Sequence, residues 1–125
     1  MSWKIDYLPG EQIVSIVCTG ELTIQELLRQ TQAANKLQIE NGARGFLADF
    51  TAADVQIPLA DLYQLPDYYA EIGVSRQSRI AVVFPPDLRQ HEKYEFYEDV
   101  CLNRGFHSRL FDSIEQARMW LKQEV

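Results

Sequence analysis

The sequence is poor in cysteine, with two thiols, Cys18 and Cys101, in 125 residues. Each lies in an apolar segment, where a reduced thiol behaves as a small hydrophobic side chain. So few cysteines exclude a disulfide-rich secreted scaffold, and we expect no disulfide between these two.

Long hydrophobic runs are also missing. No apolar stretch approaches the roughly 20 residues that a bilayer-spanning helix needs, so we expect no membrane span. Met1-Ser2-Trp3-Lys4 leads directly into an alternating pattern rather than into the continuous apolar stretch of a secretory signal. These two absences predict a cytoplasmic protein.

Positive charge is scarce. The chain has 12 Lys and Arg against 18 Asp and Glu, which gives a formal net charge of −6. The basic residues are dispersed along the chain rather than clustered with aromatic residues. Because an acidic chain repels the phosphate backbone, we expect no nucleic-acid partner.

Motifs for catalysis, metals and cofactors are absent as well. His91-Glu92 has no second histidine four residues further on, which a zinc-binding helix would require. No helix begins directly after Gly42-Ala43-Arg44-Gly45, so these glycines do not form a phosphate loop. Cys101 has no activating charge pattern around it, and His107 has no candidate nucleophile nearby. We expect no catalytic residue, no metal site and no cofactor.

What the sequence does contain is an alternation of strand-like and helix-like segments. Hydrophobic patterning predicts strands over residues 3–7, 13–18, 46–50, 80–84 and 106–111. Apolar stripes and capping residues predict helices over residues 24–41 and 87–103, two short pieces at 59–64 and 67–72 separated by Pro66, and a last helix capped by Asp112 or Ser113. This alternation is typical of an α/β fold with a mostly parallel sheet.

The charges within the predicted strands indicate the order of the sheet. The second and fourth strands are apolar on both faces, and the third nearly so apart from Asp49, whereas the first and last carry charges. Strands with two apolar faces belong inside a sheet and mixed strands at its edges. We therefore predict one five-stranded sheet in the order 1-2-3-4-5, with the first strand antiparallel and the others parallel.

This strand order also predicts where the helices lie. Right-handed crossovers between sequential strands carry the successive helices over the same face of the sheet. The opposite face then needs a cover, for which we expect residues 51–74 or a second subunit. In the last helix we expect Trp120 to be largely buried against the sheet.

Charged residues separate toward the two ends of the predicted strands. Five arginines are candidates for an anion-binding or lipid-headgroup rim: Arg44, Arg76, Arg79, Arg104 and Arg109. Four aspartates fall at the other rim: Asp49, Asp54, Asp87 and Asp112. Helix electrostatics alone also predicts this separation, because helix C-termini favour cations and helix N-termini favour carboxylates. A metal site at the aspartate rim is the weaker interpretation, since few of its oxygens are close in sequence.

Tyrosine is concentrated in the segments 51–74 and 87–103. The candidates for a shared interaction surface or a pocket mouth are Tyr63, Tyr68, Tyr69, Tyr94 and Tyr97. Tyrosines gather at interfaces because they bury a large area and keep one polar contact. The alternative is that each ring covers the core separately, with its hydroxyl in water.

Several segments together resemble a known group. They are Gly20-Glu21-Leu22-Thr23, the strand Phe46-Leu47-Ala48-Asp49-Phe50, the strand that follows Arg79, and Arg109-Leu110-Phe111-Asp112 with Trp120-Leu121. The chain is similar to the SpoIIAA-like family of the STAS (sulphate transporter and anti-sigma factor antagonist) superfamily, which is related in fold to the CRAL-TRIO lipid carriers. Since these motifs are structural, the resemblance implies the fold more directly than a role.

The resemblance also has a gap. Anti-sigma factor antagonists of this family carry a phosphorylatable serine in a turn after the third strand. The matching residues 51–59 contain neither serine nor glycine, and Thr51, the hydroxyl in this stretch, lies too early. We therefore expect no phosphorylation switch of that type.

These observations define three functional hypotheses for residues 1–125, which we expect to form a single STAS-like domain. The first is a non-enzymatic binding or regulatory module that acts through contacts with a protein partner or with a second copy of itself. The second is a carrier or sensor of a small apolar ligand or lipid beneath residues 51–74. An enzyme of unknown class is the third.

Overall fold

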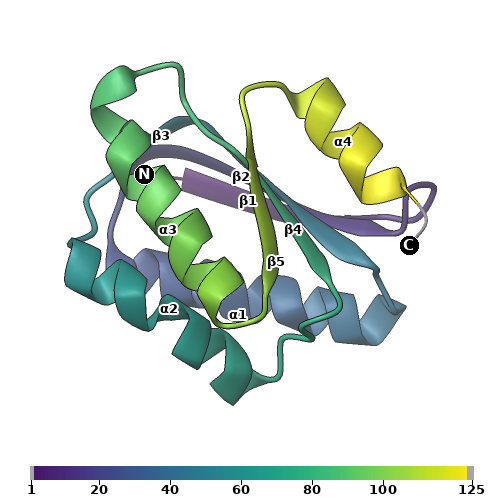
Figure 1. Cartoon of the computed structure of the whole chain (residues 1–125). Coiled ribbons are helices and arrows are strands. Elements are labelled where there is room, and N and C mark those ends of the chain that lie inside the picture. Colours follow the sequence, from purple (N-terminus) through teal and green to yellow (C-terminus); the bar gives the residue numbers. More distant parts are fainter. Residues whose placement is uncertain (1, 124–125) are drawn as a thin grey trace.

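A computed structural model of the chain describes residues 2–123 (Figure 1). The described strands are β1 (Ser2–Leu8), β2 (Ile13–Leu22), β3 (Gly45–Val55), β4 (Arg79–Val83) and β5 (His107–Phe111). The described helices are α1 (Ile24–Asn41), α2 (Leu59–Ile72), α3 (His91–Asn103) and α4 (Ile114–Lys122), with a short 3₁₀ turn, η1 (Leu88–Gln90), before α3. The sheet has the order β1-β2-β3-β4-β5, with β1 antiparallel to β2 and the other neighbours parallel. The predicted fold class and strand order are confirmed.

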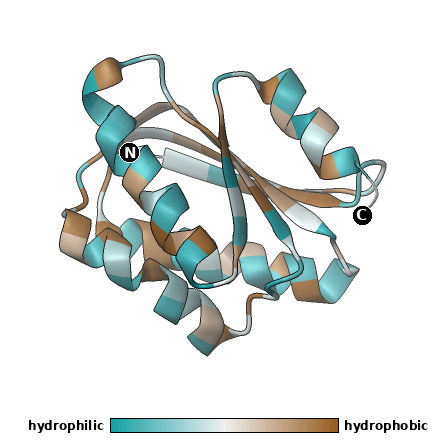
Figure 2. Cartoon of the chain, in the orientation of Figure 1, coloured by the Kyte–Doolittle hydropathy of each residue, from teal (hydrophilic) through white to brown (hydrophobic). Residues whose placement is uncertain are grey.

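Helices α1, α2 and α3 cover one face of the sheet (Figure 1). Alternate residues of the central strands, such as Ile16, Phe46 and Val82, belong to the core cluster on that face. Many residues of the central strands are hydrophobic (Figure 2). The three helices that connect parallel strands thus share a face, as the crossover argument predicts.

Helix α4 lies on the opposite face, where we had expected residues 51–74 or a second subunit. It contacts β3, β4 and β5, and its Ala117 and Leu121 pack against Leu47, Ala81 and Val83. The crossover rule governs a helix between two parallel strands. Within residues 2–123, α4 follows the last strand, β5, and does not connect two strands, so the rule does not assign it a face.

Two features of α4 differ in detail from the prediction. Ser113, rather than Asp112, caps the helix, since its Oγ accepts a hydrogen bond from Gln116 N at 3.3 Å. Trp120 is half-buried rather than largely buried, and its ring contacts Phe111 at a centroid distance of 5.6 Å. The helix docks through Ala117 and Leu121, while Trp120 covers the edge of that contact.

Strand β3 is twice as long as predicted. Residues 51–55, expected to begin an irregular segment, continue the strand, and residues 52–55 pair with residues 19–22 of β2. The register shifts between Val17 and Thr19, where β3 holds one extra residue. Asp49 Oδ1 accepts hydrogen bonds from Thr51 N at 3.0 Å and Thr51 Oγ1 at 2.7 Å at this bulge. Of the residues 51–59 that the resemblance matches to the serine-bearing turn, 51–55 are thus strand residues and 56–58 connect β3 to α2.

Helix α2 is one helix, not two short pieces. Pro66 lies inside it and is fully buried. A proline removes one backbone hydrogen bond from a helix and tends to break it. Here Leu62, Leu65 and Tyr69 on the same helix are buried as well, and this packing offsets the lost bond.

Helix α3 begins later than predicted. Asp87 caps the turn η1, because its Oδ1 accepts from Arg89 N at 3.0 Å, and α3 itself begins at His91. At α1 the prediction is confirmed, since Thr23 Oγ1 accepts from Glu26 N at 3.4 Å and the helix ends at Gly42, with φ of 62°.

Candidate ligand-binding cavity

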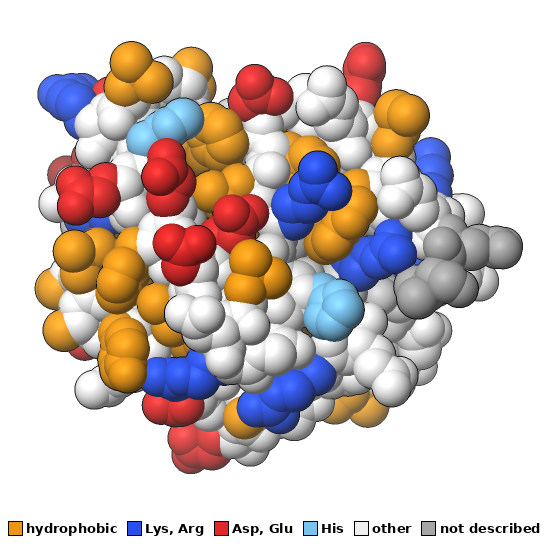
Figure 3. Space-filling model, viewed as in Figure 1, with side chains coloured by type: hydrophobic (Ala, Val, Ile, Leu, Met, Phe, Trp, Pro, Cys, Tyr) orange, Lys and Arg blue, Asp and Glu red, His pale blue; other side chains and the backbone are white. Residues whose placement is uncertain are grey.

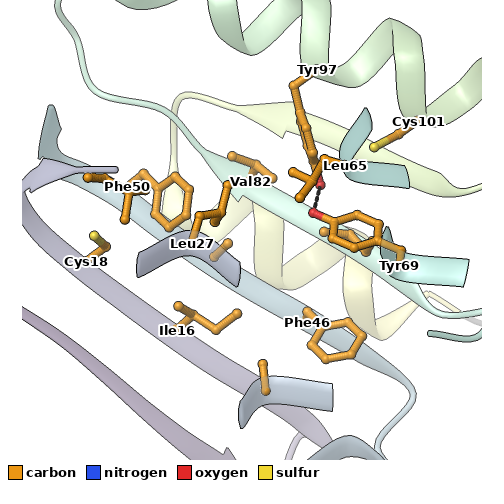
Figure 4. Close-up of a cluster of buried hydrophobic side chains, with 14 of the residues drawn as sticks. Ile16, Cys18, Leu27, Phe46, Phe50, Leu65, Tyr69, Val82, Tyr97 and Cys101 are labelled. Atoms are coloured by element: carbon orange, nitrogen blue, oxygen red, sulfur yellow. Dashed lines mark hydrogen bonds between the residues drawn. The ribbon is translucent and has the colours of Figure 1, made fainter. Parts of the chain in front are cut away.

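A cavity of about 80 Å³ lies between β2, β3 and β4 on one side and α1, α2 and α3 on the other. Apolar side chains form most of its wall: Ile16, Leu22, Leu27, Ala34, Phe46, Ala48, Phe50, Val55, Ile57, Leu62, Leu65, Val74, Ile80 and Val82. Figure 4 shows several of them converging from the sheet and from the helices above it. We call this space the core cavity.

Six polar side chains complete the wall, and four of them leave no buried polar atom without a partner. The Tyr69 and Tyr97 hydroxyls bond to each other at 2.9 Å, shown by the dashed line in Figure 4. Thr31 Oγ1 donates to the Leu27 carbonyl at 2.8 Å. Lys93 Nζ donates to the Val55 carbonyl at 3.0 Å. The ammonium group is therefore held at the end of β3.

The other two polar side chains have an oxygen without a partner. Gln30 is 1 % exposed and Tyr94 is 5 % exposed. Gln30 Oε1 and the Tyr94 hydroxyl are buried and make no hydrogen bond within the described structure. The Gln30 amide nitrogen donates weakly to Cys18 Sγ at 3.6 Å. Buried polar groups in proteins are normally paired, so these two oxygens are exceptional.

Burial keeps the tyrosines around the core cavity neutral. Loss of solvation raises the pKa values of Tyr69, Tyr94 and Tyr97 above their ordinary value of 10. For Tyr94, the neighbouring Cys18 raises the pKa further. These hydroxyls therefore act as hydrogen-bonding groups, not as anions, at neutral pH.

The two cysteines are free and buried. Burial raises the pKa of the Cys101 thiol from 9.0 to about 12, and it also raises the pKa of Cys18. Because the thiolate is the reactive form, both thiols are poor nucleophiles in the folded protein.

The structure does not bring the five candidate tyrosines onto one surface. Tyr69, Tyr94 and Tyr97 are buried in the core, where they line the cavity. Tyr68 is half-buried, and its hydroxyl donates to the Leu28 carbonyl at 3.4 Å. Tyr63 is 54 % exposed. An interaction surface stays a prediction for Tyr63 and Tyr68 alone, because the other three rings face inward.

Among the candidate anion-rim residues, two arginines bind helix C-termini. The Arg79 guanidinium donates to the Trp120 carbonyl and, at 3.0 Å, to the Gln123 carbonyl at the end of α4. Arg76 Nε donates to the Arg104 carbonyl at the end of α3, at 3.1 Å. Helix electrostatics predicts such contacts without any ligand.

The remaining candidates of this rim are spread out. Arg104 pairs with Asp67 and lies over the Tyr63 ring, 4.8 Å from its centroid. Arg109 lies in the middle of β5, so it is not at the rim where it was predicted. Arg44 is exposed beside β3. The viewed face gathers acidic side chains over α3, while basic side chains are scattered elsewhere (Figure 3). An anion site at this rim stays a prediction.

The aspartate rim is occupied by local contacts. Asp49 bonds to Thr51, and Asp87 caps η1 and pairs with Arg89 at 2.9 Å. Asp54 and Asp112 are exposed. Within residues 2–123, no group of three His, Cys, Asp or Glu side chains is placed to hold a metal ion.

Sequence reasoning missed Gln30, although a signal was present. Gln30 lies on the apolar stripe of α1, three residues after Leu27 and four before Ala34. Residues at these spacings share one face of a helix. A glutamine within such a stripe is a buried polar group, whose partner is worth seeking.

Among known proteins, similarity to this chain was found in solved structures. No protein-family model and no curated protein matches the sequence. The fold is similar to that of the anti-sigma factor antagonist SpoIIAA in its unphosphorylated form, with a TM-score of 0.57, 14 % identity and 94 % of each chain covered. It is also similar to an uncharacterized protein of the DUF3478 family with a SpoIIAA-like fold from Shewanella loihica PV-4, with a TM-score of 0.61 and 15 % identity over 96 % of this chain and 92 % of that one. This chain therefore has a SpoIIAA-like fold, as the sequence resemblance implies.

Proposed function

We propose that this protein is a non-enzymatic binding module that holds a small, mainly apolar molecule in the core cavity. The observation that carries the proposal is the cavity itself, with an apolar wall and two unpartnered buried oxygens. Ligand sites are commonly apolar cavities with a few placed polar groups. This is the carrier or sensor hypothesis, with the site beneath α1, α2 and α3.

The other groups of the described structure support a non-enzymatic role. The thiols of Cys18 and Cys101 are held in their unreactive, protonated form. His91 packs edge-on against the Phe84 ring at 4.4 Å, and His107 is exposed on an edge strand. Two reduced, buried thiols also support the expectation of a cytoplasmic protein. No helix within residues 2–123 is long and apolar enough to cross a membrane.

Native mass spectrometry of freshly purified protein, combined with a toluene titration followed by NMR, tests this function. We expect either a copurifying small molecule or toluene-induced shifts at residues of the core cavity. Ala34→Leu should fill the cavity and abolish binding, because Ala34 is 2 % exposed and lies in the wall. Ala60→Leu is the matched control, since Ala60 is exposed on α2 and does not line the cavity. Shifts that survive in Ala34→Leu would contradict the proposal.

A regulatory role through protein contacts is the second candidate. It is favoured by Leu59 and Tyr63, which are 40 % and 54 % exposed and lie four residues apart on α2, on one face of the helix. SpoIIAA, to which the fold is similar, is described as an anti-sigma factor antagonist. Exposed aromatic residues are frequent at protein interfaces.

Sedimentation velocity of Tyr63→Glu tests the second candidate in its self-associating form. The new charge should make the protein more monomeric without unfolding it, because Tyr63 contributes little to the core. Gln64→Glu is the control, since it adds the same charge at the next exposed position of α2. A parent protein that is already monomeric would exclude self-association and leave a separate partner.

A further inference from the structure

We propose that the molecule held in the core cavity is a neutral alcohol or phenol whose hydroxyl group binds Gln30 Oε1 and the Tyr94 hydroxyl together. This inference rests on the proposed function, and it adds the chemical class of the ligand. Its support is that Gln30 Oε1 and the Tyr94 hydroxyl have no hydrogen-bond partner and belong to residues that line the same cavity.

Gln30 and Tyr94 both lie near Cys18 of β2, at one end of the cavity. Gln30 contacts Cys18 of β2 through its amide nitrogen at 3.6 Å. Cys18 lies where β2 pairs with β3 around Phe50, and the Phe50 and Tyr94 rings are 6.4 Å apart in an edge-to-face arrangement. Figure 4 shows Cys18 and Phe50 together, apart from the Tyr69–Tyr97 pair. We call this region the Gln30 end.

The other polar side chains of the cavity wall already have hydrogen-bond partners. The hydroxyls of Tyr69 and Tyr97 bond to each other, and Thr31 bonds to the backbone of its own helix. A ligand that bonds to these groups would have to break an existing hydrogen bond. At the Gln30 end, by contrast, a ligand bond replaces nothing. A buried oxygen without a partner has lost its water and gained no bond, so it favours any ligand that supplies one.

The hydrogen-bonding capacity of this pair selects the ligand group. A glutamine Oε1 accepts, and a tyrosine hydroxyl can donate as well as accept. One hydroxyl on a ligand can donate to Gln30 and accept from Tyr94 at the same time. A pure hydrocarbon satisfies neither oxygen.

The electrostatics of the wall favour a neutral ligand over an ionised one. Lys93 is the charged side chain in the wall, and its ammonium group bonds to the Val55 carbonyl at 3.0 Å. An ionised carboxylate bound beside Gln30 Oε1 would lose its hydration, and pairing it with Lys93 would require the ammonium group to give up its bond to the Val55 carbonyl. Burying an uncompensated charge is far more costly than burying a neutral polar group.

The size of the cavity limits the hydrocarbon part. One water molecule needs about 10–15 Å³ of cavity volume on this measure. The core cavity of about 80 Å³ therefore holds on the order of five to eight non-hydrogen atoms. Phenol and pentan-1-ol fall in this range.

Phenol and toluene provide a matched pair of probes, since they differ in a hydroxyl against a methyl group. We expect NMR titrations of the full chain to give about tenfold tighter binding of phenol than of toluene, the preference that two modest hydrogen bonds supply. Tyr94→Phe and Gln30→Leu should each reduce this preference. Tyr63→Phe, which removes an exposed hydroxyl outside the cavity wall, is the control and should leave it unchanged.

The outcomes separate the two proposals. Equal binding of phenol and toluene to the parent protein would overturn the alcohol inference and leave the proposed function standing. Binding of neither probe would overturn both, and would mean that the two oxygens bind a water molecule only. If Gln30→Leu fails to fold, Tyr94→Phe decides alone, because it removes one buried atom; an unchanged preference in that variant would refute the role of Tyr94.

Discussion

The hydroxyl groups of Tyr69 in α2 and Tyr97 in α3 lie 2.9 Å apart and hydrogen-bond in the core. Both residues are buried, at 6 % and 8 % exposed. The bond joins the two helices directly above the sheet (Figure 4). It explains how two tyrosines can face inward at little cost, since each satisfies the polar atom of the other.

Breaking this pair should destabilise the protein in a non-additive way. Tyr97→Phe leaves the Tyr69 hydroxyl without this partner, and we expect it to lower the free energy of unfolding by about 1–2 kcal/mol. Tyr69→Phe should have a similar effect. The double variant should lose less than the sum, because no orphaned hydroxyl of the pair then remains. Urea unfolding measures all three variants, and additive losses would show that the hydroxyls do not interact.

The Arg79 side chain should stabilise the docking of α4. Its guanidinium donates to the carbonyls of Trp120 and Gln123 and lies 5.3 Å from the centroid of the Trp120 ring. We expect Arg79→Ala to lower the free energy of unfolding by about 1–2 kcal/mol. Arg44→Ala is the control and should change it by less than about 0.5 kcal/mol, because Arg44 is exposed. Equal effects in thermal unfolding would contradict a capping role for Arg79.

Glu98 should protect the edge of the sheet. Its Oε2 accepts a hydrogen bond from Leu110 N at 2.7 Å, in the edge strand β5. Unpaired edge-strand groups promote association with other strands. In Glu98→Ala we expect faster amide hydrogen exchange at Leu110 and more aggregation on storage. Glu98→Gln retains an acceptor oxygen and should stay close to the parent; loss of protection in both variants would point to the charge instead of the hydrogen bond.

Stability should fall in alkaline solution. Burial raises the pKa of the Cys101 thiol from 9.0 to about 12, and it raises the pKa values of Tyr69, Tyr94 and Tyr97 above 10. Above pH 9 the unfolded chain therefore releases protons that the folded protein retains, so the free energy of unfolding decreases as pH rises. Each such group contributes a slope of about 1.4 kcal/mol per pH unit.

Urea unfolding between pH 7 and pH 11, about the range set by these groups, measures this dependence. Tyr94→Phe removes one of the groups, so its slope should be shallower than that of the parent above pH 10. A free energy of unfolding that stays constant through this range would contradict the burial of these acids.

The strand order could be predicted from the sequence because burial leaves a pattern in each strand. Strands β2 and β4 are apolar on both faces, and β1 and β5 carry charges, which assigns the interior and the edges. The two ends of α1 could also be predicted, since Thr23 acts through a local hydrogen bond and Gly42 through its backbone conformation. Such local signals depend on residues close in sequence.

Other features depend on contacts between distant segments. Pro66 stays within α2 because the helix packs on the core, although proline alone predicts a break. The extension of β3 to Val55 follows from pairing with β2, and α4 occupies the second face because its Ala117 and Leu121 pack against the sheet there. None of these contacts has a counterpart in local sequence preference.

The candidate site shows the same division. The sequence by itself determined that tyrosines are concentrated in two segments and that the chain has no motif for metal or covalent chemistry. Only the tertiary structure decided that three of these tyrosines turn inward, and that Gln30 and Tyr94, 64 positions apart in the numbering, leave their oxygens unpaired around one cavity. The physical reason is that the packing of α1 and α3 onto the sheet decides which hydrogen-bond partners each side chain meets. Composition and periodicity do not encode these partners.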